Sequence, residues 1–131
     1  MRVHGFFPLH GTARNQATFT AQEYYELLHS CRATLTSFTD DIYLTTKASS
    51  SVAAALLSGV PLVASRRLLQ AYSYLALDAV FLMEDGMADA EAMARVAALP
   101  DEQAHAVAAA VGRLQKRLFR RNVDALRHMM A

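Results

Sequence analysis

The chain has 131 residues, of which 53% are hydrophobic and 19% are charged, and its formal net charge is +1. This length suits a single domain over residues 1–131, and the near-neutral charge makes nucleic acid an unexpected partner. The single Cys31 excludes an internal disulfide. We expect a cytoplasmic protein, because a reducing compartment suits a lone thiol and the first residues lack a secretory signal. No apolar run is long enough for a membrane span.

The first third of the chain predicts two strands around one helix. Residues 3–7 form a short apolar run before a proline, which is typical of a strand. Thr20 and Glu23 have the spacing of a capping box, in which each side chain satisfies the other residue's backbone N–H, so a helix is predicted from there to about Ser30. Residues 33–38 are β-prone and lead into a turn.

The centre of the chain carries the clearest local signal. After an expected loop over residues 42–48, three serines precede an alanine-rich run that ends at Gly59. Serine favours the N-cap of a helix, and glycine is a frequent stop just after the last helical residue. The sequence therefore predicts a helix over residues 50–58, a tight turn at Gly59 and a buried strand over residues 61–64.

The last half of the chain predicts three helices and one strand. Leucines and a tyrosine recur at helical spacing over residues 66–77, and residues 79–83 form a further apolar strand. A helix is expected over residues 88–99, and Pro100 starts a last helix that runs to about Met130. The alternation of strands and helices predicts a three-layer, Rossmann-like α/β fold with a small parallel sheet of about four strands and a long C-terminal helix.

The order of several segments carries a resemblance. A strand that ends in glycine (His4-Gly5-Phe6) is followed by a helix at residues 23–28, then by Lys47-Ala48-Ser49-Ser50-Ser51-Val52, and then by the exit Ser58-Gly59-Val60-Pro61-Leu62-Val63-Ala64. Residues 71–75 and a basic tail helix come after them. In this order the segments resemble much of the C-terminal, nucleotide-sugar-binding domain of GT-B-fold glycosyltransferases.

The resemblance implies a donor site at the serine helix. Ser49, Ser50 and Ser51 would receive the diphosphate of a nucleotide-sugar, with Lys47 as its charge partner. The resemblance also places His4, Gly5 and Tyr43 in loops near the donor. No cofactor is implied, since the nucleotide-sugar would itself be the donor substrate.

The chain departs from the family pattern in ways that bear on catalysis. Thr46 and Ala54 stand where many retaining members carry two glutamates, one of which binds the donor ribose. The N-terminal lobe, which binds the acceptor, has no counterpart in these residues. The expectation is a glycosyltransferase only if another domain completes it, and otherwise a pseudoenzyme. The alternative is a non-catalytic interaction subunit that retains the fold.

Other polar residues have simpler explanations. Asp40 and Asp41 follow a strand and are read as a turn, and the five histidines show no ligand pair on one helix face, so no metal is expected. The basic face of the tail helix suits solvent, while an acidic partner, RNA or a membrane surface are the alternatives. We also expect a protein partner or a second copy to cover the sheet edge.

Overall fold

Three short strands form a parallel sheet at the centre of the computed structural model, which describes residues 20–38 and 41–131. The strands are β1 (Thr34–Leu35), β2 (Leu62–Ser65) and β3 (Val80–Met83), with β2 in the middle. Thr34 pairs with Leu62, and Leu62 pairs with Val80. The result is a mixed α/β structure with a three-stranded parallel sheet. The strand expected at residues 3–7, which would be a fourth, lies outside the described residues.

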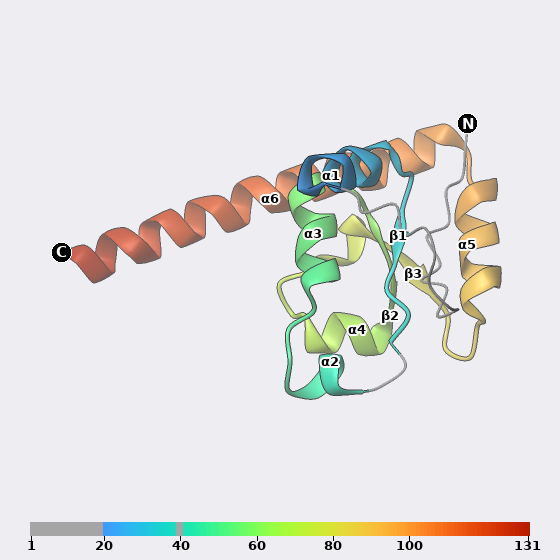
Figure 1. The fold of residues 1–131 in the computed structure, drawn as a ribbon, viewed down its shortest axis with the longest axis horizontal. Helices are drawn as coiled ribbons and strands as arrows, with labels where there is room; N and C mark the ends of the chain where they lie inside the picture. Colours follow the sequence, from blue (N-terminus) through green and yellow to red (C-terminus); the bar gives the residue numbers. More distant parts are fainter. Residues whose placement is uncertain (1–19, 39–40) are drawn as a thin grey trace.

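The helices connect and cover these strands (Figure 1). They are α1 (Ala21–Ser30), α2 (Ile42–Thr45), α3 (Ser50–Ser58), α4 (Arg66–Ala71), the short 3-10 helix η1 (Leu77–Ala79), α5 (Asp89–Ala98) and α6 (Asp101–Met130).

Local signals set the start of α1 and the end of α3. The capping box is present at α1, where Thr20 Oγ1 accepts the N–H of Glu23 and the Glu23 carboxylate accepts the N–H of Thr20. The turn after α3 is made by Gly59 with φ of +72°, a left-handed conformation that glycine adopts without strain. The predicted bounds of α3 are therefore confirmed.

Side chains of β2 alternate between two groups of buried residues, as the twofold repeat of a strand requires. Leu62 and Ala64 pack with α3 and α4, in a cluster completed by Val52, Ala55, Leu68, Tyr72 and Val80. Val63 packs on the opposite side with Phe81 and with residues of α5 and the start of α6, namely Ala92, Val96 and Ala104. Both faces of the central strand are therefore buried against helices.

Three predicted segments differ in the structure. The helix expected over residues 66–77 ends at Ala71, because Tyr72 leaves the helical conformation and turns its ring into the core. The strand expected over residues 33–38 is reduced to Thr34–Leu35. The loop expected over residues 42–48 contains α2, whose first turn is held by the carbonyl of Asp41, which accepts bonds from the Leu44 N–H and the Thr45 hydroxyl.

The long helix α6 has two different halves. Its first half packs on the rest of the molecule through Ala110, Val111 and Leu114, with Leu118 partly buried at the edge of this contact. No residue of α6 after Leu118 is buried, and Figure 1 shows this half extending away from the other elements. None of the described helices has both the length and the apolar content that crossing a bilayer requires.

Candidate functional site

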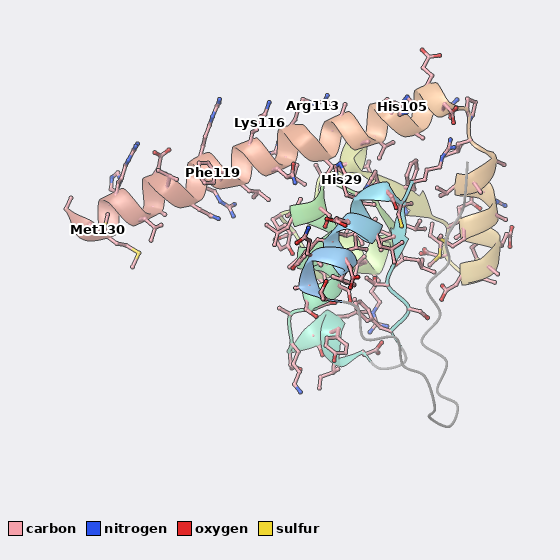
Figure 2. All side chains as sticks on the ribbon, turned by 45° about the horizontal axis from the view of Figure 1, so that its top comes forward. His29, His105, Arg113, Lys116, Phe119 and Met130 are labelled. Carbon is pink, nitrogen blue, oxygen red and sulfur yellow. The ribbon has the colours of Figure 1, made fainter. Side chains whose placement is uncertain are left out.

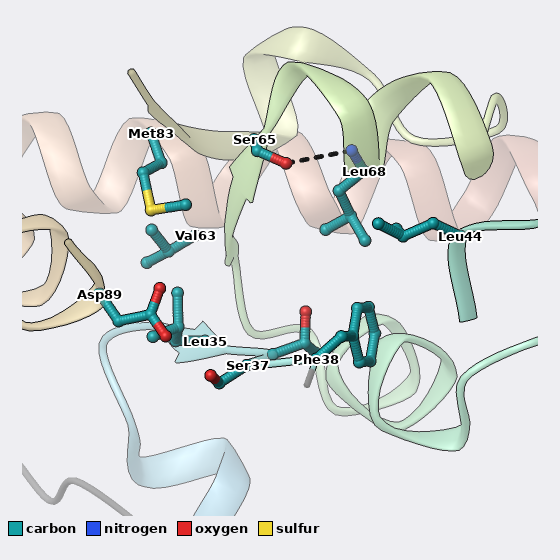
Figure 3. Close-up of a pocket in the computed structure, with 10 residues that line it drawn as sticks. Leu35, Ser37, Phe38, Leu44, Val63, Ser65, Leu68, Met83 and Asp89 are labelled. Carbon is teal, nitrogen blue, oxygen red and sulfur yellow. Dashed lines mark hydrogen bonds between the residues drawn. The ribbon is translucent and has the colours of Figure 1, made fainter. Parts of the chain in front are cut away.

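A pocket of about 170 Å³ lies where the parallel strands end (Figure 3). Its wall includes Leu35 of β1, Val63 and Ser65 of β2, and Met83 of β3. Ligands of open parallel sheets bind at the carboxyl ends of the strands, because the connecting loops that follow are free to vary there. This pocket has the position of a ligand site in such a fold.

The wall of the pocket is mainly apolar with a few polar groups. In Figure 3, Met83 and Asp89 lie on one side, while Phe38 and Leu44 lie on the other. Asp89 belongs to the first turn of α5, where the helix dipole favours a carboxylate. The Ser65 hydroxyl already accepts the Leu68 N–H at 3.1 Å and so caps α4.

One buried polar atom belongs to a residue that lines the pocket and has no hydrogen-bond partner among the described residues. Thr36 lines the pocket, and its Oγ1 is buried without a hydrogen bond to any described residue. Buried hydroxyls in native proteins are nearly always hydrogen-bonded, so this atom lacks the partner that such groups usually have. The exposed Ser37 and Asp89 side chains can bind a molecule that carries hydroxyl groups.

The serine helix begins at the same end of the sheet. The link through Val60 and Pro61 is short, so α3 runs antiparallel to β2 and its N-terminus lies toward the end of β2 where α4 begins. Ser49 is the N-cap and is buried, but its side chain makes no capping bond. Ser50 and Ser51 are exposed in the first turn. The first turn of α3 therefore has N–H groups that no described side chain caps.

Buried hydrogen bonds hold the loop before α3 in place. The Ser49 N–H donates to the Tyr72 hydroxyl oxygen at 2.9 Å, and this hydroxyl donates to the Tyr43 carbonyl oxygen at 2.7 Å. The Tyr43 ring stacks on Phe38, with ring centres 5.2 Å apart. Tyr43 is thus joined to Ser49 through Tyr72, a link that the sequence did not indicate because Tyr72 is far away along the chain.

The other predicted site residues are more dispersed. Lys47 is exposed, with its backbone N–H bonded to the Ile42 carbonyl. Neither Lys47 nor the three serines line the pocket. His4 and Gly5 lie outside the described residues.

The two positions at which the family pattern has acids differ in their surroundings. Thr46 is exposed and donates its hydroxyl to the Ile42 carbonyl at 3.4 Å. Ala54 is buried in α3, and its side chain is a methyl group. Neither position supplies a carboxylate near the serines.

Asp41 forms an ion pair with Arg67. Both carboxylate oxygens of Asp41 accept bonds from the Arg67 guanidinium, at 2.8 and 2.7 Å. These bonds and the charge of Asp41 raise the pKa of Arg67. This ion pair therefore links the start of α2 to α4. In the described parts of the chain, no three or more His, Cys, Asp or Glu residues are grouped to hold a metal ion.

The cysteine has the environment of an unreactive thiol. Burial raises the pKa of Cys31, and its Sγ donates to the Leu27 carbonyl at 3.2 Å. A raised pKa leaves little thiolate at neutral pH, and thiolate is the nucleophilic form.

Comparison with known proteins identifies no relative: no family model, no curated protein and no solved structure matches this chain.

Proposed function

We propose that this chain is a three-layer, Rossmann-like domain that binds the diphosphate of a nucleotide-sugar donor at the N-terminus of α3. One observation carries the proposal: the first turn of α3 has no side-chain cap, while Ser50, Ser51 and Lys47 are exposed around it. Backbone N–H groups at the positive end of a helix dipole bind phosphate oxygens, and a lysine adds a full charge. The resemblance of the segment order to GT-B-fold glycosyltransferases supports the choice of a nucleotide-sugar.

The pocket supports the same ligand class. It lies at the strand ends toward which α3 points its N-terminus, and it offers Ser37 and Asp89 to hydroxyl groups. A nucleotide-sugar has such hydroxyls on both its ribose and its sugar. The diphosphate would bind at α3, and a hydroxyl-bearing part would enter the pocket.

In sugar transfer, the bond between the sugar and the diphosphate breaks and negative charge grows on the departing phosphate. Lys47 and the N–H groups of α3 would stabilise this charge. None of the described residues is assigned to acceptor binding or to a general base. Transfer is therefore proposed only for the domain completed by an acceptor-binding lobe.

The test is thermal unfolding of the chain with UDP, GDP and ADP, each alone and as a sugar conjugate. A ligand at a hundred times its dissociation constant adds about 2.7 kcal/mol to the free energy of unfolding, a shift of several degrees. Ser50→Pro removes one N–H from the first turn of α3, and proline is tolerated at the first helical position. The extended backbone of Ser49 also suits a following proline.

The matched control is Ala21→Pro, the same change at the first residue of α1. We expect the nucleotide shift to be lost in Ser50→Pro, reduced in Lys47→Ala and unchanged in Ala21→Pro. The absence of any shift in the folded native chain, or an undiminished shift in Ser50→Pro, contradicts the proposal.

A second candidate is a non-catalytic interaction subunit. The observation that favours it is the second half of α6, which exposes large apolar side chains and, after Leu118, extends away from the other described elements. Flat nucleotide curves from a folded protein would favour this candidate.

A further inference from the structure

We propose that the second half of α6, residues 116–130, is an arm that lies on the surface of an anionic lipid membrane. Rising 1.5 Å per residue, the helix continues for about 18 Å beyond Leu118, the last residue that packs on the rest of the molecule. Figure 2 shows Phe119 and Met130 on this arm, well clear of the other elements. The inference does not depend on the donor site.

The arm has a wide apolar side. Phe119 is 70% exposed, and Leu126, Met129 and Met130 are 56%, 82% and 80% exposed. At about 100° per residue, these side chains and Val123 fall in a sector that covers roughly a third of the helix circumference, and Leu118 and Ala125 extend it to almost half. A seam for one partner helix is narrower than this, whereas a helix in a membrane interface buries a broad face.

Part of the apolar side is turned away from the other described elements. Leu114 faces the core and is 2% exposed. Phe119 is about 140° further round the axis, so its side of the arm points away from the packed elements. A flat surface can approach the arm from the side of Phe119 and Met130.

Cationic side chains occupy the opposite side of the arm. Residues 116–130 carry five cations and one carboxylate, a net charge of +4, while residues 1–115 carry eight cations and eleven carboxylates, a net charge of −3. Lys116 and Arg127 border the apolar sector on one edge and Arg121 borders it on the other, where long side chains can reach lipid phosphates. Arg127 also pairs with Asp124 at 3.6 Å.

This distribution of charge favours a membrane over other occupants. The arm, with its net positive charge, is attracted to an anionic surface. The remainder of the molecule has a net negative charge and is not attracted to that surface. A second copy would bring two arms of the same charge together. RNA would engage the cations and leave the apolar sector in water. An anionic membrane satisfies both sides of the arm at once.

The test is co-sedimentation of the full chain with vesicles of equal parts phosphatidylcholine and phosphatidylserine, and with vesicles of phosphatidylcholine alone. We expect binding to the anionic vesicles that weakens with salt, and about fivefold weaker partitioning for each cation removed in Arg120→Gln and Arg127→Gln. The double variant Phe119→Ser/Leu126→Ser should bind the anionic vesicles at least tenfold more weakly than the native chain.

Leu57→Ser is the matched control, because Leu57 is a leucine on α3 that is even more exposed than Leu126 and lies outside the arm. It should bind as the native chain does. No binding to anionic vesicles at low salt, or equal binding by Phe119→Ser/Leu126→Ser, overturns the proposal. A dimer seen by light scattering that this double variant dissociates, or poly(U) binding without vesicle binding, also overturns it in favour of a second copy or of RNA.

Discussion

The Tyr72 hydroxyl oxygen lies 2.9 Å from the backbone nitrogen of Ser49, so the residue that follows α4 holds the residue that precedes α3. The same hydroxyl donates to the Tyr43 carbonyl and therefore links α2 to Ser49, the residue before α3. This one side chain positions the first turn of α3, where we propose that phosphate binds.

Replacing Tyr72 by phenylalanine should lower the free energy of unfolding by about 2–3 kcal/mol, because a buried N–H and a carbonyl lose their partner. Urea unfolding measures this change. Tyr74→Phe is the control. Tyr74 is half-buried beside Tyr72 and its hydroxyl makes no hydrogen bond to a described residue, so removal of this hydroxyl should have little effect. Equal destabilisation by both changes would contradict the assignment of the loss to the bonds that the Tyr72 hydroxyl makes with Ser49 and Tyr43.

The capping box of α1 should make stability depend on pH. The Thr20 N–H and then its hydroxyl donate to the Glu23 carboxylate, and these bonds hold the pKa of Glu23 below its ordinary value. A lowered folded-state pKa means that the ionised group stabilises the fold above the unfolded-state pKa, and that this contribution is lost as the pH falls through the folded-state pKa.

NMR titration should therefore find the pKa of Glu23 higher in Thr20→Ala than in the native chain. The stability difference between the two chains should shrink as the pH falls, down to the part due to the lost cap of the Glu23 N–H. Thr20→Ala keeps the backbone N–H that is the larger cause of the shift, so an unchanged pKa would contradict only the part assigned to the Thr20 hydroxyl.

Two glycines should respond in opposite directions to alanine. At Gly59 the backbone has φ of +72°, and an added Cβ would meet only Gln115 at ordinary contact distances of 3.8 and 3.9 Å. Gly59→Ala should then cost about 1 kcal/mol through backbone conformation alone.

Gly112 lies inside α6 and has nothing within 4 Å of an added Cβ. Gly112→Ala should stabilise the protein by roughly 0.5–1 kcal/mol, since glycine is a poor helix residue. Thermal unfolding measures both changes, and two changes of the same sign would contradict this account of α6 and the α3 turn.

The two halves of α6 should differ in what a leucine contributes. Leu114 is buried, so Leu114→Ala should lower the free energy of unfolding by about 2–4 kcal/mol. Leu126 is exposed on the arm, so Leu126→Ala should change it by less than about 0.5 kcal/mol. Denaturant unfolding of the monomer measures both. A large loss for Leu126→Ala would mean that the arm packs on the molecule after all.

Much of the candidate site could be predicted from the sequence, but the contacts between its distant segments could not. The serines, Gly59 and the start of β2 follow from residues that are neighbours in the chain. The pocket could not be predicted, because Leu35, Val63 and Met83 meet only when three strands align. The pairing of Asp41 with Arg67 depends in the same way on α2 and α4 lying side by side.

The sequence by itself determined the elements whose ends are set by bonds within four residues: the capping box of α1, the glycine that ends α3 and the proline that precedes α6. Only the tertiary structure decided the pairing of the strands, the early end of α4 at Tyr72 and the division of α6 into a packed half and a free arm. Hydrogen bonds between residues close in sequence can form at a helix end wherever the helix lies in the fold. The burial of Tyr72 and the exposure of Phe119 depend instead on which segments distant in sequence pack against them.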